Sequence, residues 1–173
     1  MTTQDLVTEE FNPFYRTYIN MLPKNLNLID GFEAGFKNVQ DFFKSIPKDK
    51  LEYKYALDKW TVKEVFQHII DTERIFMYRC LRVARHDKSP LAGFEQNDYI
   101  QPSKANSKTI ESLLEEYRTT RQYSIVLLKS FSDEDLKFIG TASGNVMSAR
   151  SAAFSTIGHE IWHMNIIRDR YLK

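Results

Sequence analysis

Apolar residues recur along most of the chain at steps of three and four, the spacing of one face of an α-helix. Four long segments with this pattern predict helices over residues 26–45, 61–85, 107–129 and 148–172. A shorter aromatic stretch over 12–22 predicts a brief N-terminal helix that stops at Pro23, because proline cannot continue a helix. The pattern as a whole predicts an all-α protein.

Polar signals separate these helices. Thr61 and Glu64 form the T-x-x-E capping box that begins the second long helix. The segment 86–106 is rich in turn-forming residues and lacks periodicity, so it predicts a long irregular connection. Ser132 caps a predicted helical turn in SDEDL, and the following FIGTASGNV predicts a turn or small hairpin. Since no internal repeat is present, one antiparallel four-helix domain over residues 1–173 is the simplest account.

Composition narrows the class of protein further. The 173 residues include 24 Lys and Arg against 23 Asp and Glu, and a net charge of +1 gives no electrostatic basis for binding nucleic acid or anionic membranes. The longest strictly aliphatic run, Ile125–Leu128, is far shorter than the ~20 residues of a membrane-spanning helix. The single cysteine, Cys80, and an N-terminus without a signal-peptide pattern predict a cytoplasmic protein. The oligomeric state stays open, with a homodimer as one option.

Histidines carry the clearest chemical signal. His159 and His163 in GHEIWHM lie one helical turn apart and project from one face, which is the usual helical spacing of two ligands of one metal ion. His68 is the candidate third ligand, because it lies on the apolar side of its helix, where an unpartnered imidazole is costly to bury. If the second and the last long helix run antiparallel, His68 lies at the same level along the bundle axis as His159 and His163 to within about two helical turns. His86, in the polar stretch RHDKS at a helix end, is left out of the site.

Three imidazoles without a fourth protein ligand are typical of a catalytic metal site, which keeps one position open. Such ligands accept Zn²⁺, Ni²⁺, Fe²⁺ or Cu²⁺, so the identity of the metal stays open. For each histidine alone, a core residue hydrogen-bonded to a carbonyl or carboxylate is the competing interpretation.

Two carboxylates near these histidines are candidate catalytic groups. Glu160 completes the H-E-x-x-H pattern in which metalloproteases use the glutamate as general base, but an all-helical chain offers no edge strand for a peptide substrate. Asp71 follows His68 by three residues and is placed to accept an imidazole N–H or to contact metal-bound water. A solvated carboxylate on the helix surface is the alternative for Asp71.

Basic residues recur at three-residue steps at the end of the second predicted helix and lie near the end of the chain: Arg79, Arg82, Arg85, Arg168 and Arg170. A solvated basic face is the simplest interpretation, and a site for the carboxylates of a thiol cofactor or substrate is the alternative. Cys80 occupies an apolar helix position and is predicted to pack in the core.

Five stretches together resemble the DinB-like (DinB/YfiT-like) family of metal-dependent enzymes. They are KWTVKEVFQHIIDTERIFMYRCLRVARHD, PLAGFEQNDY, FSDEDL, TASGNVMSAR and GHEIWHMNIIRDRYL, of which the last is the most specific. The resemblance covers nearly the full length and implies a four-helix bundle with up-down-down-up topology, in which the long connection joins parallel neighbours. It also implies a divalent metal held by a histidine triad, which falls on His68, His159 and His163. Relatives often carry a second adjacent histidine where this chain has Trp162.

Characterised members of the family are thiol-dependent transferases or isomerases that use bacillithiol, mycothiol or glutathione, with the metal holding the thiol as thiolate. The resemblance therefore implies an enzyme that transfers a low-molecular-weight thiol to an electrophilic small molecule. A metal-dependent hydrolase, with Asp71 or Glu160 moving the proton, is the second hypothesis. A non-catalytic, stress-related binding module with a structural metal site is the third.

Overall fold

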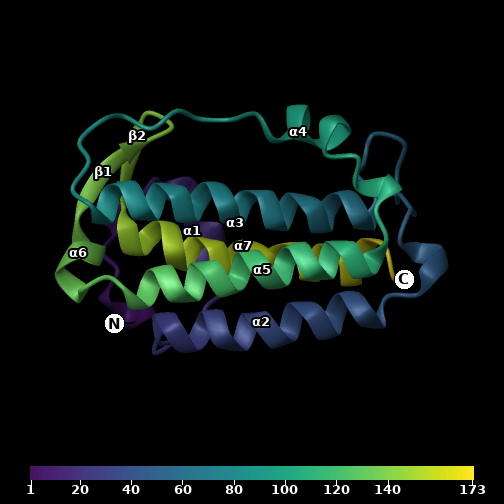
Figure 1. Ribbon diagram of the computed structural model, residues 1–173, viewed down its shortest axis with the longest axis horizontal. Helices are drawn as coiled ribbons and strands as arrows, with labels where there is room; N and C mark the ends of the chain where they lie inside the picture. The colour runs from purple at the N-terminus through teal and green to yellow at the C-terminus, as the bar shows by residue number, and fades with distance from the viewer.

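Four long helices make up most of the computed structural model, which describes residues 1–173. They are α2 (Leu28–Ser45), α3 (Val62–Ala84), α5 (Ile110–Lys129) and α7 (Ala149–Arg170), and they lie side by side (Figure 1). Both α2 and α3 pack against α5 and α7. The structure is mostly helical, as predicted, and each long helix begins and ends within three residues of its predicted bounds.

Side-chain caps mark the helix starts. The Thr61 hydroxyl accepts a hydrogen bond from the Glu64 backbone N–H (3.1 Å), and the Glu64 carboxylate accepts one from the Thr61 N–H (2.8 Å), so the predicted capping box is present. Ser132 likewise accepts from the Asp135 N–H and begins the short helix α6 (Asp133–Lys137), as predicted. Each cap satisfies N–H groups that the first turn leaves unpaired, which is why the helices start at these residues.

The hydrophobic core consists of two clusters, one at each end of the bundle. One cluster takes the first half of α2 and of α7 and the second half of α3, and the other takes the opposite halves of the same helices. A buried polar network that includes Arg121 of α5 separates them. The four helices are therefore held together by apolar packing at both ends and by charged groups near the middle.

The N-terminal segment packs against α7. The helix predicted over 12–22 is present but shorter, with a 3-10 turn leading into α1 (Arg16–Ile19). Gly158 allows the close approach, because a Cβ there would lie only 2.2 Å from the carbonyl oxygen of Tyr18. Every residue from 149 to 160 is consequently buried, and α7 has no solvent-facing side over that length.

The connection between α3 and α5 contains a helix, which corrects the prediction that residues 86–106 are irregular. This helix is α4 (Gln96–Ser103), and none of its residues is buried. Pro102 inside it and the lack of an apolar stripe hide the helix from an analysis of periodicity. In Figure 1 the connection runs along α3 to the start of α5, and α4 stands above the bundle.

A two-stranded hairpin precedes α7, as predicted. β1 (Ile139–Ala142) pairs with β2 (Asn145–Ser148) in antiparallel register. The two residues between the strands, Ser143 and Gly144, have positive φ values of 52° and 73°. A tight two-residue hairpin turn of type I′ requires positive φ at both positions.

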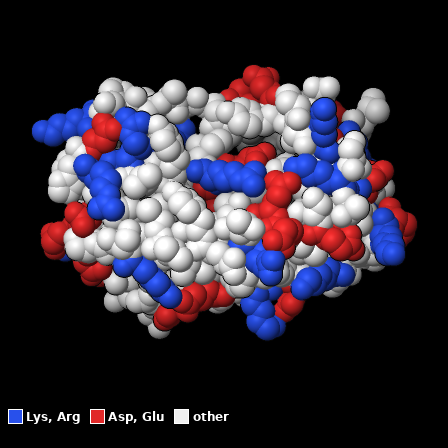
Figure 2. Space-filling view, viewed as in Figure 1, with Lys and Arg blue, Asp and Glu red and all other residues white.

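Charged side chains of both signs are interspersed on the face of the molecule in Figure 2, which has no extended basic surface. This distribution agrees with the balanced composition of the chain. None of the helices combines the length and the apolar character that crossing a membrane demands.

Candidate metal centre

Three histidines meet between α3 and α7. The Nε2 atom of His159 lies 3.0 Å from the Nε2 of His68 and 3.0 Å from the Nε2 of His163. All three residues are buried, and their ligand atoms lie within 4.8 Å of one another. The structure thus brings together the three histidines singled out from the sequence. His86 lies elsewhere, with its ring stacked on Phe138.

Aromatic rings surround the three imidazoles. Trp60 packs against His68, Tyr18 against His159 and Trp162 against its neighbour His163, with ring centroids 4.8, 5.3 and 4.7 Å apart. The Thr72 hydroxyl lies 3.4 Å from Nδ1 of His68, one turn away on α3. These contacts hold the rings in orientations that direct the Nε2 atoms to one point.

Burial keeps the three imidazoles neutral. It lowers the pKa of His68 to about 4, and burial together with the neighbouring histidines holds the pKa of His159 and of His163 well below the usual value of free imidazole. Each ring therefore has one nitrogen with a free lone pair at neutral pH, which is the form that binds metals.

The convergence of the nitrogens suits a metal ion better than hydrogen bonds among the rings. A neutral imidazole nitrogen carries either one proton or one lone pair, so Nε2 of His159 cannot bond well to both neighbours at once. Two nitrogens each about 2.0–2.1 Å from one divalent ion lie roughly 3 Å apart when their bonds to it meet near a right angle. The two separations from Nε2 of His159 match that distance, and all ligand atoms lie within 4.8 Å of one another, so the residues present fit a divalent metal.

The histidines line a cavity of about 720 Å³, a size typical of sites for small organic ligands. The stripe of α3 that faces it includes Val65, His68, Thr72, Phe76 and Arg79, and α7 adds His159 and His163. Aromatic side chains supply much of the remaining wall: Phe14, Tyr15, Tyr18, Tyr55, Trp60, Phe94, Trp162 and Tyr171. The three imidazoles are therefore accessible to a small molecule that enters an aromatic-lined space.

Neither candidate carboxylate lines this cavity. Asp71 accepts hydrogen bonds from the Gln67 side chain (3.0 Å) and from Arg74 (3.1 Å) on the surface of α3. Glu160 follows His159 directly, and successive residues of a helix point about 100° apart, so its side chain is directed into the bundle. A catalytic role for either residue stays a prediction.

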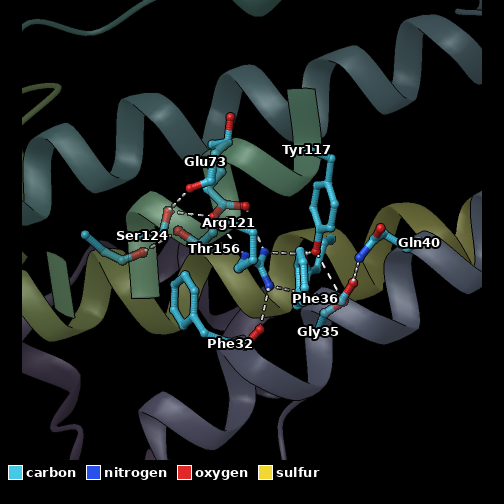
Figure 3. Close-up of polar contacts among 12 residues, drawn as sticks. Phe32, Gly35, Phe36, Gln40, Glu73, Tyr117, Arg121, Ser124 and Thr156 are labelled. Carbon is cyan, nitrogen blue, oxygen red and sulfur yellow. Dashed lines mark hydrogen bonds and ion pairs between the residues drawn. The ribbon is translucent and has the colours of Figure 1, made fainter. Parts of the chain in front are cut away.

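Glu160 belongs to a buried network centred on Arg121. Figure 3 shows Arg121 of this network between the helices, together with Glu73 and Tyr117. The Arg121 guanidinium donates to the carboxylates of Glu73 and Glu160 and to the carbonyl oxygen of Phe32. The Tyr117 hydroxyl donates to Glu160 (3.1 Å). Burial raises the pKa of Glu160, although Arg121 opposes that shift. The network joins α2, α3, α5 and α7.

Sequence reasoning missed Arg121 and Glu73, and a signal for both was present. Arg121 follows Tyr117 by four residues and precedes Leu128 by seven, so it occupies an inward position of its helix. Glu73 stands in the same way between Ile70 and the buried Met77. One acid and one base at inward positions of two helices indicate a buried ion pair.

Among the arginines considered above, Arg79 alone lines the cavity. Arg82 pairs with Asp87, and Arg85 and Arg168 lie over aromatic rings elsewhere. Cys80 is buried, and burial raises the pKa of its thiol to about 12, so the thiol stays protonated at neutral pH and packs in the core.

Two solved structures share this fold. YfiT from Bacillus subtilis, described as a probable metal-dependent hydrolase with an unusual four-helix bundle topology, superimposes with a TM-score of 0.74 at 13% identity, covering 86% of this chain and 89% of YfiT. A mycothiol-dependent maleylpyruvate isomerase superimposes with a TM-score of 0.66 at 14% identity and covers 99% of this chain. This chain spans only 63% of the isomerase. At such low identities the likeness shows the fold alone.

The sequence itself also matches a known family. No curated protein matches the chain, but the sequence profile of the DinB superfamily matches residues 32–167. That region contains the four long helices almost entirely and all three clustered histidines. The resemblance found in the sequence motifs is confirmed: the chain belongs to the DinB superfamily.

Proposed function

We propose that the protein is an enzyme in which His68, His159 and His163 hold one divalent metal ion. The observation that carries this proposal is the convergence of three neutral, buried imidazole nitrogens beside a cavity of ligand size. No other His, Cys, Asp or Glu joins the cluster, so a bound ion would keep a position for a ligand from the cavity. The geometry leaves Zn²⁺, Ni²⁺, Fe²⁺ and Cu²⁺ as options.

The chain's own residues supply position and environment for this chemistry. A divalent ion with an open position lowers the pKa of a thiol or a water molecule that binds there. The three imidazoles would hold the ion, and the rings of Trp60, Tyr18 and Trp162 that pack against them keep the imidazoles in place. The aromatic side chains give the cavity an apolar surface against which an organic substrate can pack.

The reaction we propose is transfer of a low-molecular-weight thiol to an electrophilic small molecule. The sulfur forms a bond to the electrophilic carbon, the leaving group departs with its electron pair, and the thiol proton goes to solvent. This chemistry needs no carboxylate base in the cavity, whereas a hydrolase needs one within reach of the attacking water. Asp71 and Glu160 lie outside the cavity, and the two carboxylates that line it have other partners, Asp58 with Lys59 and Glu95 with Asn97. This arrangement supports thiol transfer, as does the shared fold with a mycothiol-dependent enzyme.

Metal analysis tests the site directly. Protein purified without a chelating tag is expected to contain one divalent ion per chain by elemental analysis. Replacing His68, His159 or His163 by alanine removes a ligand and should abolish that content, whereas His86→Ala should leave it unchanged. Retention of the metal by His68→Ala together with its loss in His86→Ala would refute the assignment of ligands.

Turnover distinguishes the proposed reaction from its rivals. Metal-loaded protein is expected to conjugate a chlorinated aromatic electrophile to glutathione, bacillithiol or mycothiol, and to lose this activity in His159→Ala. Hydrolysis of esters or amides without any thiol, lost by a hundredfold or more in Asp71→Asn, would replace the proposal with the hydrolase that the description of YfiT suggests. Metal-free protein of unchanged stability, without either activity, would favour the binding module.

We also propose that the four helices follow the up-down-down-up order that the family resemblance implies. The path of the connection along α3 in Figure 1 supports this order. That the 173 residues form one domain, and that the protein is cytoplasmic, stay predictions from the sequence.

A further inference from the structure

Arg79 is the one buried lysine or arginine that has no carboxylate partner. It is only 2% exposed, and no Asp or Glu oxygen lies within 4.0 Å of its guanidinium. The other buried basic residues are paired: Arg121 with Glu73 and Glu160, Arg150 with Glu10, and Lys63 with Glu52. Burying an unpaired charge costs free energy. Arg79 therefore carries a buried positive charge that an anionic ligand would compensate.

Three N–H groups of Arg79 have no acceptor within the protein. A guanidinium carries five N–H groups, and Nη2 donates to the carbonyl oxygen of Ala92 (3.0 Å) and to the Ser143 hydroxyl (2.9 Å). The N–H of Nε and the two of Nη1 remain. Only Ser155 Oγ is fully enclosed without a partner, so the free N–H groups of Arg79 are open to a ligand.

The guanidinium is held in place by parts of the chain that are themselves fixed. Leu91 donates its N–H to the Thr141 carbonyl (2.8 Å) and accepts the Ser143 N–H (2.9 Å), so the segment before α4 is bonded to the hairpin turn. Ala92 and Ser143, the two acceptors for Arg79, are thereby fixed relative to each other. The cation is positioned before any ligand arrives, which lowers the entropy lost on binding.

Arg79 and the histidine cluster lie along the same stripe of α3. Arg79 follows His68 by eleven residues, which is three helical turns with an angular offset of about 20° and a rise of about 16 Å. Val65, Thr72 and Phe76 belong to the same cavity-lining stripe. The cavity therefore offers nitrogen ligands near one end and an unpaired cation some three turns away.

We propose that Arg79 binds the carboxylate of an elongated organic acid whose reacting group lies at the histidine cluster. This acid is either the thiol or the electrophile to which the thiol is transferred. Only the placement of its reacting group at the histidines rests on the proposed function, whereas the binding of its carboxylate by Arg79 does not. A single negative charge matches the single unpaired cation. A phosphate dianion would leave one charge uncompensated beside Phe76 and Phe94, whose rings lie 5.7 and 5.8 Å from the guanidinium carbon.

Metal-free protein tests the anion site independently of the metal. Both tryptophans of the chain, Trp60 and Trp162, line the cavity, so their fluorescence reports binding. Wild-type protein is expected to bind 4-phenylbutyrate at least tenfold more tightly than the neutral 4-phenylbutyramide. Arg79→Met should bind the two equally, and Arg79→Lys should keep part of the preference. Arg74→Met, on the same helix but outside the cavity, should keep all of it.

Stability separates a binding role from a structural one. Because Arg79 has no carboxylate partner, Arg79→Met is expected to melt at or above the wild-type temperature. A wild type that does not prefer the carboxylate, or an Arg79→Met variant that keeps the wild-type preference, would overturn the inference. So would a loss of stability in Arg79→Met as large as that in Arg121→Met.

Cobalt-loaded protein tests whether one ligand spans the distance from the histidine cluster to Arg79. We expect 8-mercaptooctanoate to change the visible cobalt spectrum at lower concentration than 8-mercaptooctanol, and Arg79→Met to abolish that difference. If both thiols changed the cobalt spectrum of the wild type at the same midpoint concentration, the proposal that an elongated acid binds would be refuted. Absence of any spectral change with either thiol would refute the metal proposal, while the phenylbutyrate result would still decide the role of Arg79.

Discussion

Replacing Arg121 by methionine would remove the one cation that Glu73 and Glu160 share. Arg121 is fully buried and donates four hydrogen bonds to the two carboxylates. Methionine preserves much of the volume and removes the charge. The carboxylates would keep only the hydroxyls of Ser124 and Tyr117 as partners. The perturbation therefore leaves two buried acids without a counter-charge.

The expected loss of folding free energy follows from the number of acids that lose their counter-charge. Breaking a buried ion pair by removing one partner destabilises a protein by about 3–5 kcal/mol, and here one residue serves two acids. We expect a loss of at least ~4 kcal/mol at neutral pH. With a urea dependence of about 2 kcal/mol per molar, this loss lowers the midpoint of unfolding by about 2 M.

The loss should depend on pH in a defined direction. Burial raises the pKa of Glu160 and Arg121 opposes that shift. Without Arg121 the pKa of Glu160 therefore lies further above its value in the unfolded chain. Such a group adds stability at low pH and loses that contribution as pH rises through the raised pKa. The difference between Arg121→Met and wild type should therefore be wide at pH 8 and narrower at pH 5.

Urea unfolding followed by circular dichroism at both pH values measures this effect. Arg118→Met is the matched control, because Arg118 lies on the same helix and is exposed, with only a surface pair to Glu115. It is expected to cost under about 1 kcal/mol. If Arg121→Met lost no more than this control, or if its deficit grew at low pH, the account of the network as a paired charge cluster would be wrong.

Two further predictions concern the histidines and the N-terminal segment. Because burial lowers the pKa of His68 to about 4, the unfolded chain takes up a proton below about 6.5 that the folded chain excludes. Metal-free protein should therefore lose about 2 kcal/mol through this residue between pH 7 and 5. Urea midpoints should show a smaller loss in His68→Gln, and an equal loss would contradict the assignment. Gly158→Ala places a Cβ 2.2 Å from the Tyr18 carbonyl and should cost about 1–3 kcal/mol in thermal melts. Gly93→Ala, with 3.3 Å to its nearest neighbour, should cost less, and the reverse order would refute the packing argument.

The sequence predicted the bundle because its signals are local. A helical stripe and a capping box such as Thr61 with Glu64 depend on residues within one or two turns, and these elements appear where expected. α4 was not predicted because none of its residues is buried and it contains Pro102, a residue that normally ends a helix. A helix that buries little of its surface needs no apolar stripe, so its sequence lacks the helical spacing of apolar residues.

The candidate site was predictable to the extent that it rests on helical spacing. His159 and His163 share a face by spacing alone, and His68 followed from its height in the bundle. Which way Glu160 points depends on the charge it meets on α5, and that partner lies far away in the sequence. Arg79 likewise differs from Arg82 through its partners, since Arg79 donates to Ala92 and to Ser143 of the distant hairpin, whereas Arg82 pairs with Asp87.

Part of the cavity wall comes from a different region of the chain than the histidines proposed to hold the metal. Residues 14–18 supply part of the aromatic wall, yet they lie before residue 32, where the match to the family begins. The histidines, in contrast, all lie on helices within the matched region. Changes in the N-terminal segment can therefore alter which small molecules the cavity admits, while the three histidines stay the same. Members of one superfamily can in this way diverge in selectivity without rebuilding their chemistry, and exchanging this segment between relatives is a direct route to new substrate ranges.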